Sequence, residues 1–203
     1  MRIAVIGATG RTGLAFVEEA HRRGHEIVAV VRNPDRLSIR VERVERADAR
    51  SAVELAAAIH GVDAVVFCVG PGPDAPHGIV TEAITSTIEA MHTAGIARLL
   101  MITATGPFTD GDAPLLRYVL KPLVQRILRA PFADLAAADA IVQASDLDWS
   151  IVRPPQLADG PSKGSYRTDP RWGLRITRAD LAIAMADALE GETAVSRVVS
   201  VAN

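Results

Sequence analysis

The sequence is poor in cysteine and has no run of charges of one sign. Its one cysteine, Cys68, excludes an intramolecular disulfide. The apolar neighbours of Cys68 are typical of a small buried residue in a protein of the reducing cytoplasm. The formal net charge of −2 gives no reason to expect nucleic acid or an anionic membrane as a partner.

Long apolar segments are absent as well. Charged residues, glycine or proline interrupt each apolar stretch well before the roughly 18 residues that a membrane span needs. An apolar run begins at Ile3, which leaves no room for a signal peptide ahead of it. The histidines stand apart, without the spacing of metal ligands. We therefore expect a cytoplasmic protein that binds no metal, no membrane and no nucleic acid.

What the sequence does contain is an alternation of short runs rich in Val and Ile with segments that repeat apolar residues at helical spacing. This alternation is typical of βαβ units, whose strands are apolar throughout because helices cover both faces of the sheet. We predict strands at 2–6, 26–31, 41–47, 63–69, 98–103, 149–153 and 197–201. We predict helices at 12–23, 52–60, 79–93, 114–128, 133–144 and 178–189. The expectation is one α/β domain over residues 1–203, with a doubly wound, mainly parallel sheet of about seven strands.

Two long irregular stretches interrupt this alternation, at 70–78 and at 154–174. Each follows the carboxyl end of a predicted strand, which is where open α/β sheets bind their ligands. We therefore expect these two loops to form the walls of a substrate site.

A glycine-rich turn joins the first predicted strand to the first predicted helix. It reads Gly-Ala-Thr-Gly-Arg-Thr-Gly and contributes the candidate cofactor residues Gly7, Thr9, Gly10, Arg11, Thr12 and Gly13. Glycines at such a turn allow a sharp bend, a close approach of the backbone to a pyrophosphate and tight packing of helix on strand. The amide groups at the start of the helix then bind the phosphates. Glycine triplets also occur in unrelated turns, but the strand, turn and helix here follow the order of a Rossmann-type dinucleotide site.

The end of the second predicted strand indicates which dinucleotide is bound. A carboxylate at this point would bind the free ribose diol of NAD, whereas this chain has Arg32 there. A guanidinium makes charge-assisted bonds with the 2′-phosphate of NADP, and Arg11 could reach the same group. The alternative for Arg32 is a solvated surface residue. The sequence favours NADP(H) as the cofactor.

Asp48 follows the third predicted strand and has two alternative roles. It could accept a hydrogen bond from the adenine amino group of the cofactor. It could equally cap the amino terminus of the helix predicted at 52–60.

Taken together, several motifs resemble those of the atypical short-chain dehydrogenase/reductases, in particular the NAD(P)H-binding, NmrA-like group that includes flavin reductase/biliverdin reductase B. The motifs are the glycine turn, the Val-Arg-Asn-Pro segment after the second strand, and the stretches 145–155 and 176–182, so the resemblance runs nearly from end to end. It implies a doubly wound strand order and a nicotinamide near the ends of the fourth and fifth strands.

The chain departs from the active members of the wider superfamily at their Tyr-x-x-x-Lys pair. If Asp139 matches the acid that follows this pair, Leu135 takes the lysine position and Pro131 the tyrosine position. Tyr118 and Lys121 are three residues apart rather than four and lie too early in the chain. The proton-donating dyad is absent, as the resemblance implies for biliverdin reductase B, and an acceptor that needs little acid help remains compatible with this.

The remaining candidates lie after predicted strands. The resemblance implies a serine or threonine beside the substrate at the end of the fifth strand. This makes Thr103 a candidate cofactor contact and Thr105 a candidate substrate contact, with turn hydrogen bonds as the alternative role of these hydroxyls. Gly70 would let the backbone pass under the cofactor. His77, in the loop 70–78, is a candidate general acid, although a lone loop histidine is often merely exposed.

The Arg-Pro-Pro segment after the sixth predicted strand resembles the part of the family that lies along the nicotinamide. Arg153 and Pro155 are therefore cofactor candidates, with a structural ion pair as the alternative role of Arg153.

Three functions compete. The leading one is an NADPH-dependent reductase that transfers hydride to a conjugated small-molecule acceptor such as a flavin, quinone or tetrapyrrole. The second is a non-catalytic, NmrA-like sensor that binds NADP(H) and signals through a protein partner. The third, an epimerase or dehydratase of nucleotide sugars, is disfavoured by the missing dyad.

Overall fold

The computed structural model describes residues 1–72, 76–106, 129–168, 174–191 and 195–203. Side chains are described from residue 131 onward in the third of these ranges. The helix predicted at 114–128 lies outside the described residues.

One sheet runs through the middle of the protein, with the strand order β3-β2-β1-β4-β5-β6-β10-β8. All its neighbouring strands pair in parallel except β8, which is antiparallel to β10. A separate parallel pair consists of β7 (Gln156–Ala158) and β9 (Arg175–Thr177). The strands of the main sheet are β1 (Arg2–Ile6), β2 (Glu26–Val31), β3 (Arg43–Arg46), β4 (Ala64–Phe67), β5 (Arg98–Ile102), β6 (Asp148–Arg153), β8 (Arg167–Thr168) and β10 (Arg197–Ala202).

The predicted doubly wound α/β sheet is confirmed, and all seven predicted strands are present. The sheet has eight strands rather than about seven because β8 adds two residues at the β10 edge. The stretch 154–174 was predicted to be irregular, and this is wrong in part, since it contains β7 and β8. Strands this short have no periodicity of their own and are specified by the partner strand.

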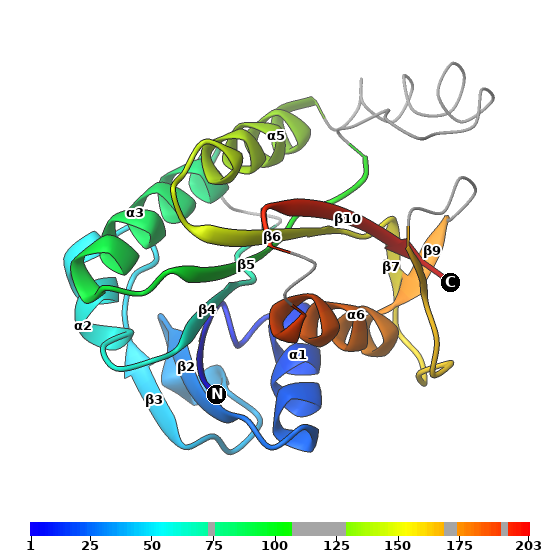
Figure 1. The fold of residues 1–203 in the computed structure, drawn as a ribbon, viewed down its shortest axis with the longest axis horizontal. Helices are drawn as coiled ribbons and strands as arrows, with labels where there is room; N and C mark the ends of the chain where they lie inside the picture. The colour runs from blue at the N-terminus through cyan, green and yellow to red at the C-terminus, as the bar shows by residue number, and fades with distance from the viewer. Residues whose placement is uncertain (73–75, 107–128, 169–173, 192–194) are drawn as a thin grey trace.

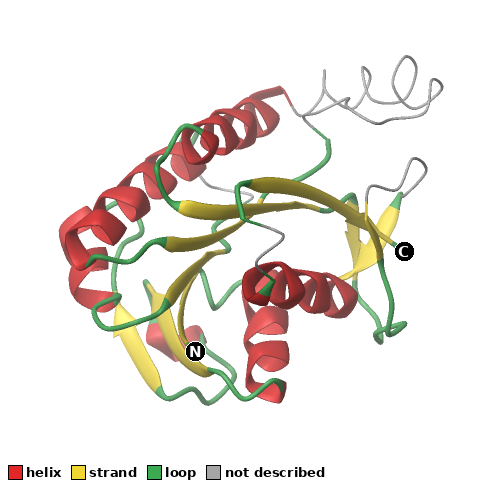
Figure 2. Ribbon diagram, viewed as in Figure 1, coloured by secondary structure: helices red, strands yellow, loops and turns green. Residues whose placement is uncertain are grey.

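Helices cover both faces of the sheet (Figures 1 and 2). One face packs against α1 (Arg11–Arg22) and α6 (Arg178–Glu190), which contact each other. The other face packs against α2 (Ala52–Ala58), α3 (Ile79–Ala94) and α5 (Arg129–Gln143). A 3₁₀ turn, η1 (Pro34–Arg36), follows β2. The five described helices lie where the sequence predicts them, and the largest difference is at α5, which begins four residues earlier, at 129 rather than 133.

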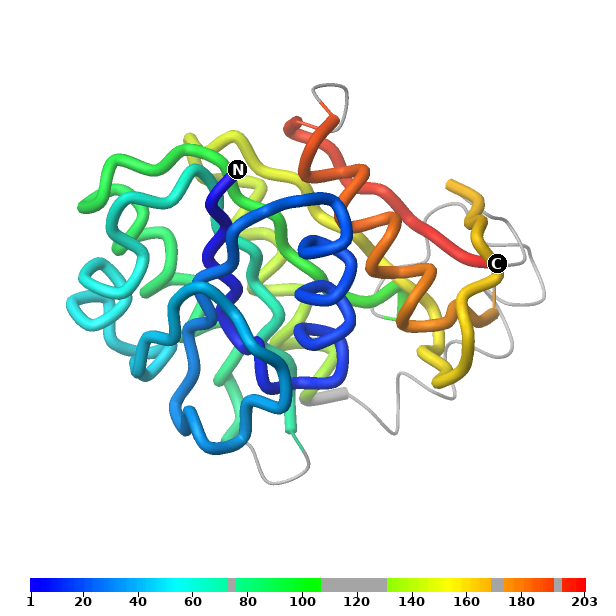
Figure 3. Tube along the Cα trace, turned by 90° about the horizontal axis from the view of Figure 1, so that it is seen from below, coloured from blue at the N-terminus to red at the C-terminus, as the bar shows by residue number. Residues whose placement is uncertain are grey.

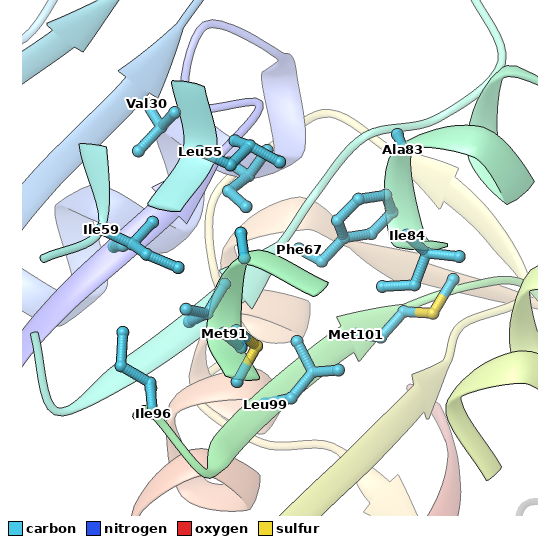
Figure 4. Packing of buried hydrophobic residues seen from close by; sticks show 14 of the residues in the cluster. Val30, Leu55, Ile59, Phe67, Ala83, Ile84, Met91, Ile96, Leu99 and Met101 are labelled. Atoms are coloured by element: carbon cyan, nitrogen blue, oxygen red, sulfur yellow. The ribbon is translucent and has the colours of Figure 1, made fainter. Parts of the chain in front are cut away.

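The central strands are buried on both faces, as their continuous apolar runs predict. On one side, Phe67 of β4 and Met101 of β5 pack against Leu55, Ile84 and Met91 of the helices, and all five side chains are fully buried (Figure 4). Next to β4, β1 pairs with it in parallel in the middle of the sheet.

The strand order reverses between β1 and β4, because β2 and β3 lie to one side of this pair and β5 and β6 to the other. At such a switch point, the loops after the two strands separate and leave a crevice for a ligand. The glycine turn, between β1 and α1, lies at this point (Figure 3).

Candidate functional site

The glycine turn begins with a residue whose backbone only glycine adopts readily. Gly7 has φ +87°, and a Cβ atom there would lie 3.0 Å from the backbone carbonyl of Cys68. Its amide donates to the carbonyl oxygen of Val30 at 3.2 Å. The turn is thereby held between the ends of β2 and β4.

The other two glycines have different roles. A Cβ atom on Gly13 would lie 2.4 Å from the carbonyl oxygen of Gly7, so glycine is needed for α1 to pack on the turn. Gly10 has an ordinary extended backbone (φ −74°, ψ 154°), and its Cβ would meet only the Gly7 oxygen, at 3.3 Å. The packing of the protein therefore requires glycine at position 13 much more than at position 10. The surface at Gly10 is open, so a ligand can approach its backbone closely.

The amino terminus of α1 is suited to an anion. Gly10 is its cap, no side chain among the described residues caps the helix, and the first turn contains no acidic residue. Its first amide groups have no partner within the helix, and the helix dipole adds partial positive charge at this end. Gly10 and Arg11 are exposed here, and Thr9 and Thr12 are partly buried. This arrangement is suited to a phosphate, and phosphate binding by these residues stays a prediction.

Arg32 and Asp48 follow the paired strands β2 and β3, on the side of β1 where the sheet continues to β3. Arg32 is exposed directly after β2, and its charge contributes to the low pKa of Asp48. The larger cause is Arg50, whose side chain and backbone amide bond Asp48 and lower its pKa to about 2. A guanidinium and an ionised carboxylate thus follow two neighbouring strands, and contact of Arg32 with the cofactor stays a prediction.

The suggestion that Asp48 caps α2 is wrong. Ser51 is the cap, and its Oγ accepts from the Glu54 amide at 3.3 Å. The Asp48 carboxylate instead accepts from Arg50, with a shortest distance of 2.7 Å. Its predicted contact with adenine stays a prediction.

Arg11 lies next to a residue that the sequence did not single out. Its Nη1 is 3.0 Å from Oδ2 of Asp159, in the loop after β7. The other oxygen of Asp159 pairs with Arg178, at the start of α6. The glycine turn is thus joined by charge to the loop that we expected to form a substrate wall.

A buried network lies at the carboxyl ends of β5 and β6. Arg153 donates to Asp139 of α5 through Nε at 3.0 Å and Nη2 at 2.8 Å. Thr103 donates to the same carboxylate at 3.3 Å, and Gln143 donates as well. The structural ion pair that was one alternative for Arg153 is therefore present. Contact of Thr103 and Arg153 with a cofactor stays a prediction.

Thr105 lies beside the Pro-Pro segment that follows β6. Its amide donates to the Pro154 carbonyl at 2.9 Å, which continues the β5–β6 pairing past the end of the strands and brings Pro155 to the same edge. Gly70 and His77 belong to the loop that follows β4, and both are exposed. These four candidates thus follow the carboxyl ends of β4, β5 and β6, on the nicotinamide side of the expected site.

The helix α5 contains no tyrosine or lysine at the positions of the family dyad. Leu135, at the lysine position, is buried, and Pro131 is partly buried. The carboxylate of Asp134 accepts from the amides of Val80 at 3.0 Å and Thr81 at 2.9 Å and so caps α3. Tyr118 and Lys121 lie outside the described residues.

Asp180 holds the loop after β7 in place. Its buried carboxylate accepts from Ser162 Oγ at 2.6 Å, from the amides of Lys163 at 2.9 Å and Gly164 at 3.1 Å, and from Thr177 Oγ1 at 2.7 Å. Thr177 caps α6 by accepting from the Asp180 amide, so Asp180 lies in the first turn of this helix. The Thr-x-x-Asp spacing indicates this cap, but nothing in it indicates the contacts with residues 162–164.

A membrane span would need a longer and more apolar helix than any among the described residues. Within the same ranges, His, Cys, Asp and Glu side chains nowhere gather in a group of three or more that could hold a metal ion.

The comparisons with known proteins agree with this geometry. The B. subtilis protein YhfK, named as an uncharacterised sugar epimerase, is 28% identical over 97% of this chain and 92% of its own length. A 3-diazoavenalumate denitrifying reductase of Streptomyces is 30% identical over 89% of this chain and 64% of its own length. The anaerobilin reductase ChuY of Escherichia coli O157:H7 has the same fold, with a TM-score of 0.80 at 21% identity over 100% of this chain and 96% of that structure. Residues 7–192 match the profile of a family described as NAD(P)H-binding. With that match spanning the glycine turn, the sheet and α6, the chain belongs to the NAD(P)H-binding family of Rossmann-fold proteins.

Proposed function

We propose that this protein is an NADPH-dependent reductase that transfers hydride to a conjugated acceptor such as a flavin, a quinone or a tetrapyrrole-like compound. The observation that carries the proposal is the uncapped amino terminus of α1, entered through Gly10, beside a β2 strand that Arg32 directly follows. The first feature suits a pyrophosphate, and the second suits a 2′-phosphate.

The choice of NADPH over NADH depends on charge at the end of β2. No carboxylate occupies that strand end, where it would bind the ribose diol and repel a 2′-phosphate. Arg32 is exposed and directly follows the strand, so its guanidinium is free to turn toward a bound phosphate. When bound, NADPH supplies the hydride, and the protein supplies position and surroundings.

The choice of a conjugated acceptor depends on α5. The described side chains of this helix include no tyrosine or lysine, and its carboxylates Asp134 and Asp139 already accept hydrogen bonds from α3 and from Arg153. A simple ketone develops a localised alkoxide and needs a proton donor, whereas a conjugated ring spreads the charge. The acceptor that suits this helix is therefore a conjugated one.

Two other functions have less support than the reductase. A non-catalytic NADP(H) sensor would use the same cofactor residues and differ only in having no turnover. The name of the relative YhfK points to sugar epimerisation, but the absence of the family dyad from α5 counts against that chemistry here. The relative named as a reductase supports the proposal.

The test is a screen for NADPH oxidation against flavins, quinones and biliverdin, with a simple ketone as the comparison acceptor. The proposal expects acceptor-dependent oxidation with at least one conjugated compound and none with the ketone. The Gly10→Val variant serves as the control for a reaction that needs the cofactor site. Tight NADPH binding without turnover of any acceptor would favour the sensor.

A further inference from the structure

The loop after β7 is attached to the rest of the protein by two carboxylates with different surroundings. Asp180 is buried and binds Ser162 and the amides of Lys163 and Gly164, which fixes the middle of the loop. Asp159, three residues earlier than Ser162, is exposed and pairs with Arg11 and Arg178. The loop is therefore held firmly at 162–164, and Asp159 is presented from a fixed position.

The two partners of Asp159 also differ. Arg178 is 14% exposed in its side chain and begins α6, so it is largely enclosed by the fold. Arg11 is 72% exposed and is the first residue of α1, directly after Gly10. Because Arg11 is the first residue of α1 and Arg178 the first residue of α6, Asp159 lies near the amino termini of both helices. Of the two arginines, Arg11 is the one that is free to take another partner.

We propose that Asp159 competes with the phosphates of the cofactor for Arg11 and thereby sets the affinity for the cofactor. This inference rests on the proposed function, because it needs the dinucleotide to bind at the glycine turn. A phosphate held by the first amides of α1 lies within reach of a guanidinium on the first residue of that helix. Arg178 continues to hold Asp159 when Arg11 turns to the phosphate, so the loop keeps its anchor.

Electrostatic repulsion also predicts that Asp159 weakens cofactor binding. A carboxylate near bound phosphates repels them, and its bond to Arg11 must be broken before the guanidinium can bind a phosphate. Because the Arg11–Asp159 pair is exposed, its strength is modest, and we expect the gain from removing it to be about two- to fivefold in cofactor affinity. Asp159 is thus a residue that weakens cofactor binding while linking the cofactor turn to the substrate-side loop.

The experiment is a double-mutant cycle on the full chain. Dissociation constants for NADPH are measured for wild type, Asp159→Asn, Arg11→Met and the double variant, with thermal unfolding as a check on folding. The proposal expects Asp159→Asn to bind NADPH more tightly than wild type and Arg11→Met to bind it less tightly. In the Arg11→Met background, Asp159→Asn should bring a clearly smaller gain, because the contested guanidinium is gone and only the repulsion between carboxylate and phosphates remains. Asp159→Glu, which keeps the charge, should stay near wild type.

The matched control is Glu18→Gln, which removes one exposed negative charge from α1 away from the turn. An equal gain in Glu18→Gln, or an undiminished gain from Asp159→Asn without Arg11, would overturn the competition and leave only long-range repulsion. Unchanged or weaker binding by Asp159→Asn would overturn it as well. A wild-type protein that binds no NADPH would instead contradict the proposed function.

A second arm identifies the phosphate that takes Arg11. If it is the pyrophosphate, Asp159→Asn raises the affinities for NADPH and NADH by the same factor. If it is the 2′-phosphate, the gain appears with NADPH alone. Both results support the competition, and the absence of a gain with either cofactor contradicts it.

Discussion

Asp139 of α5 and Arg153 of β6 form a two-bonded ion pair inside the protein, with side chains only 1% and 11% exposed. The pair joins the helix to the sheet at the carboxyl ends of β5 and β6, next to Thr103. Because such a pair contacts little water, removing one partner leaves the other charge buried.

We therefore expect Arg153→Met to destabilise the protein by about 3 to 5 kcal/mol. Urea unfolding measures this. The comparison variant is Thr103→Val, which removes only the 3.3 Å hydroxyl contact to the same carboxylate and should cost roughly 1 kcal/mol. A loss in Arg153→Met no larger than in Thr103→Val would mean that the buried pair is not what holds α5 to the sheet.

Two glycine substitutions should separate cofactor binding from folding. Gly10→Val keeps an allowed backbone and meets little of the protein, so the fold should survive while a branched side chain blocks the phosphates. Gly13→Ala places a methyl group 2.4 Å from the Gly7 carbonyl and should destabilise the protein itself. Thermal unfolding and NADPH titration on both variants give the comparison. Normal NADPH affinity in folded Gly10→Val would count against the turn as the phosphate site.

Cofactor preference should depend on Arg32. A charge-assisted bond to the 2′-phosphate contributes about 1.5 to 3 kcal/mol, so NADPH should bind about ten- to a hundredfold more tightly than NADH. Arg32→Ala should reduce this ratio with little effect on NADH. Titrations with both cofactors test it, and Arg36→Ala, another exposed arginine after β2, is the control. An unchanged ratio in Arg32→Ala would contradict the assignment.

Lowering the pH should weaken the attachment of the loop after β7, because this attachment depends on the ionised carboxylate of Asp180. Burial by itself would raise the pKa of Asp180, but hydrogen bonds from Ser162, Thr177 and the Lys163 amide outweigh it, so the pKa lies below its ordinary value. The ionised form therefore stabilises the folded protein. This contribution is complete above the unfolded pKa of about 3.9 and is lost as the pH falls through the lower folded value.

The Asp180→Asn variant should accordingly be less stable than wild type near neutral pH and lose less stability on acidification. The free energy of unfolding in urea, measured from about pH 6 to pH 2.5, shows both effects. If the wild type and Asp180→Asn lose stability in parallel, the ionised Asp180 is not what the loop depends on.

The reaction should distinguish conjugated acceptors from simple ketones, because placing the hydride against a stacked acceptor contributes several kcal/mol without a proton donor. Thr105→Ala should lower the rate by at most about tenfold if the hydroxyl only orients the acceptor. Tyr118→Phe should have no measurable effect. Steady-state rates with a flavin or quinone and with a ketone, on both variants, decide this. Rapid ketone turnover that collapses in Tyr118→Phe would overturn both the alignment of Pro131 with the missing tyrosine and the mechanism.

The sequence predicted the longer strands more accurately than the short ones. The bounds of β1 and β2 were predicted to the residue, because each is a continuous apolar run bounded by polar residues or glycine. The strands β7, β8 and β9 were missed, since segments of two or three residues carry no pattern that could be read in advance. The role of Asp134 as the cap of α3 was missed too, because more than fifty residues separate it from the amides it binds.

By itself, the sequence determined the doubly wound sheet, the position of the glycine turn and the arginine at the end of β2. These features follow from apolar periodicity and from residues that are neighbours in the chain. Only the tertiary structure decided that Asp48 pairs with Arg50 rather than capping α2, that Arg153 is paired with Asp139, and that Asp159 faces Arg11. The reason is physical: the strength of a charge contact depends on distance in space and on burial, and for Asp159 and Arg11 the fold brings together residues that the chain separates by 148 positions.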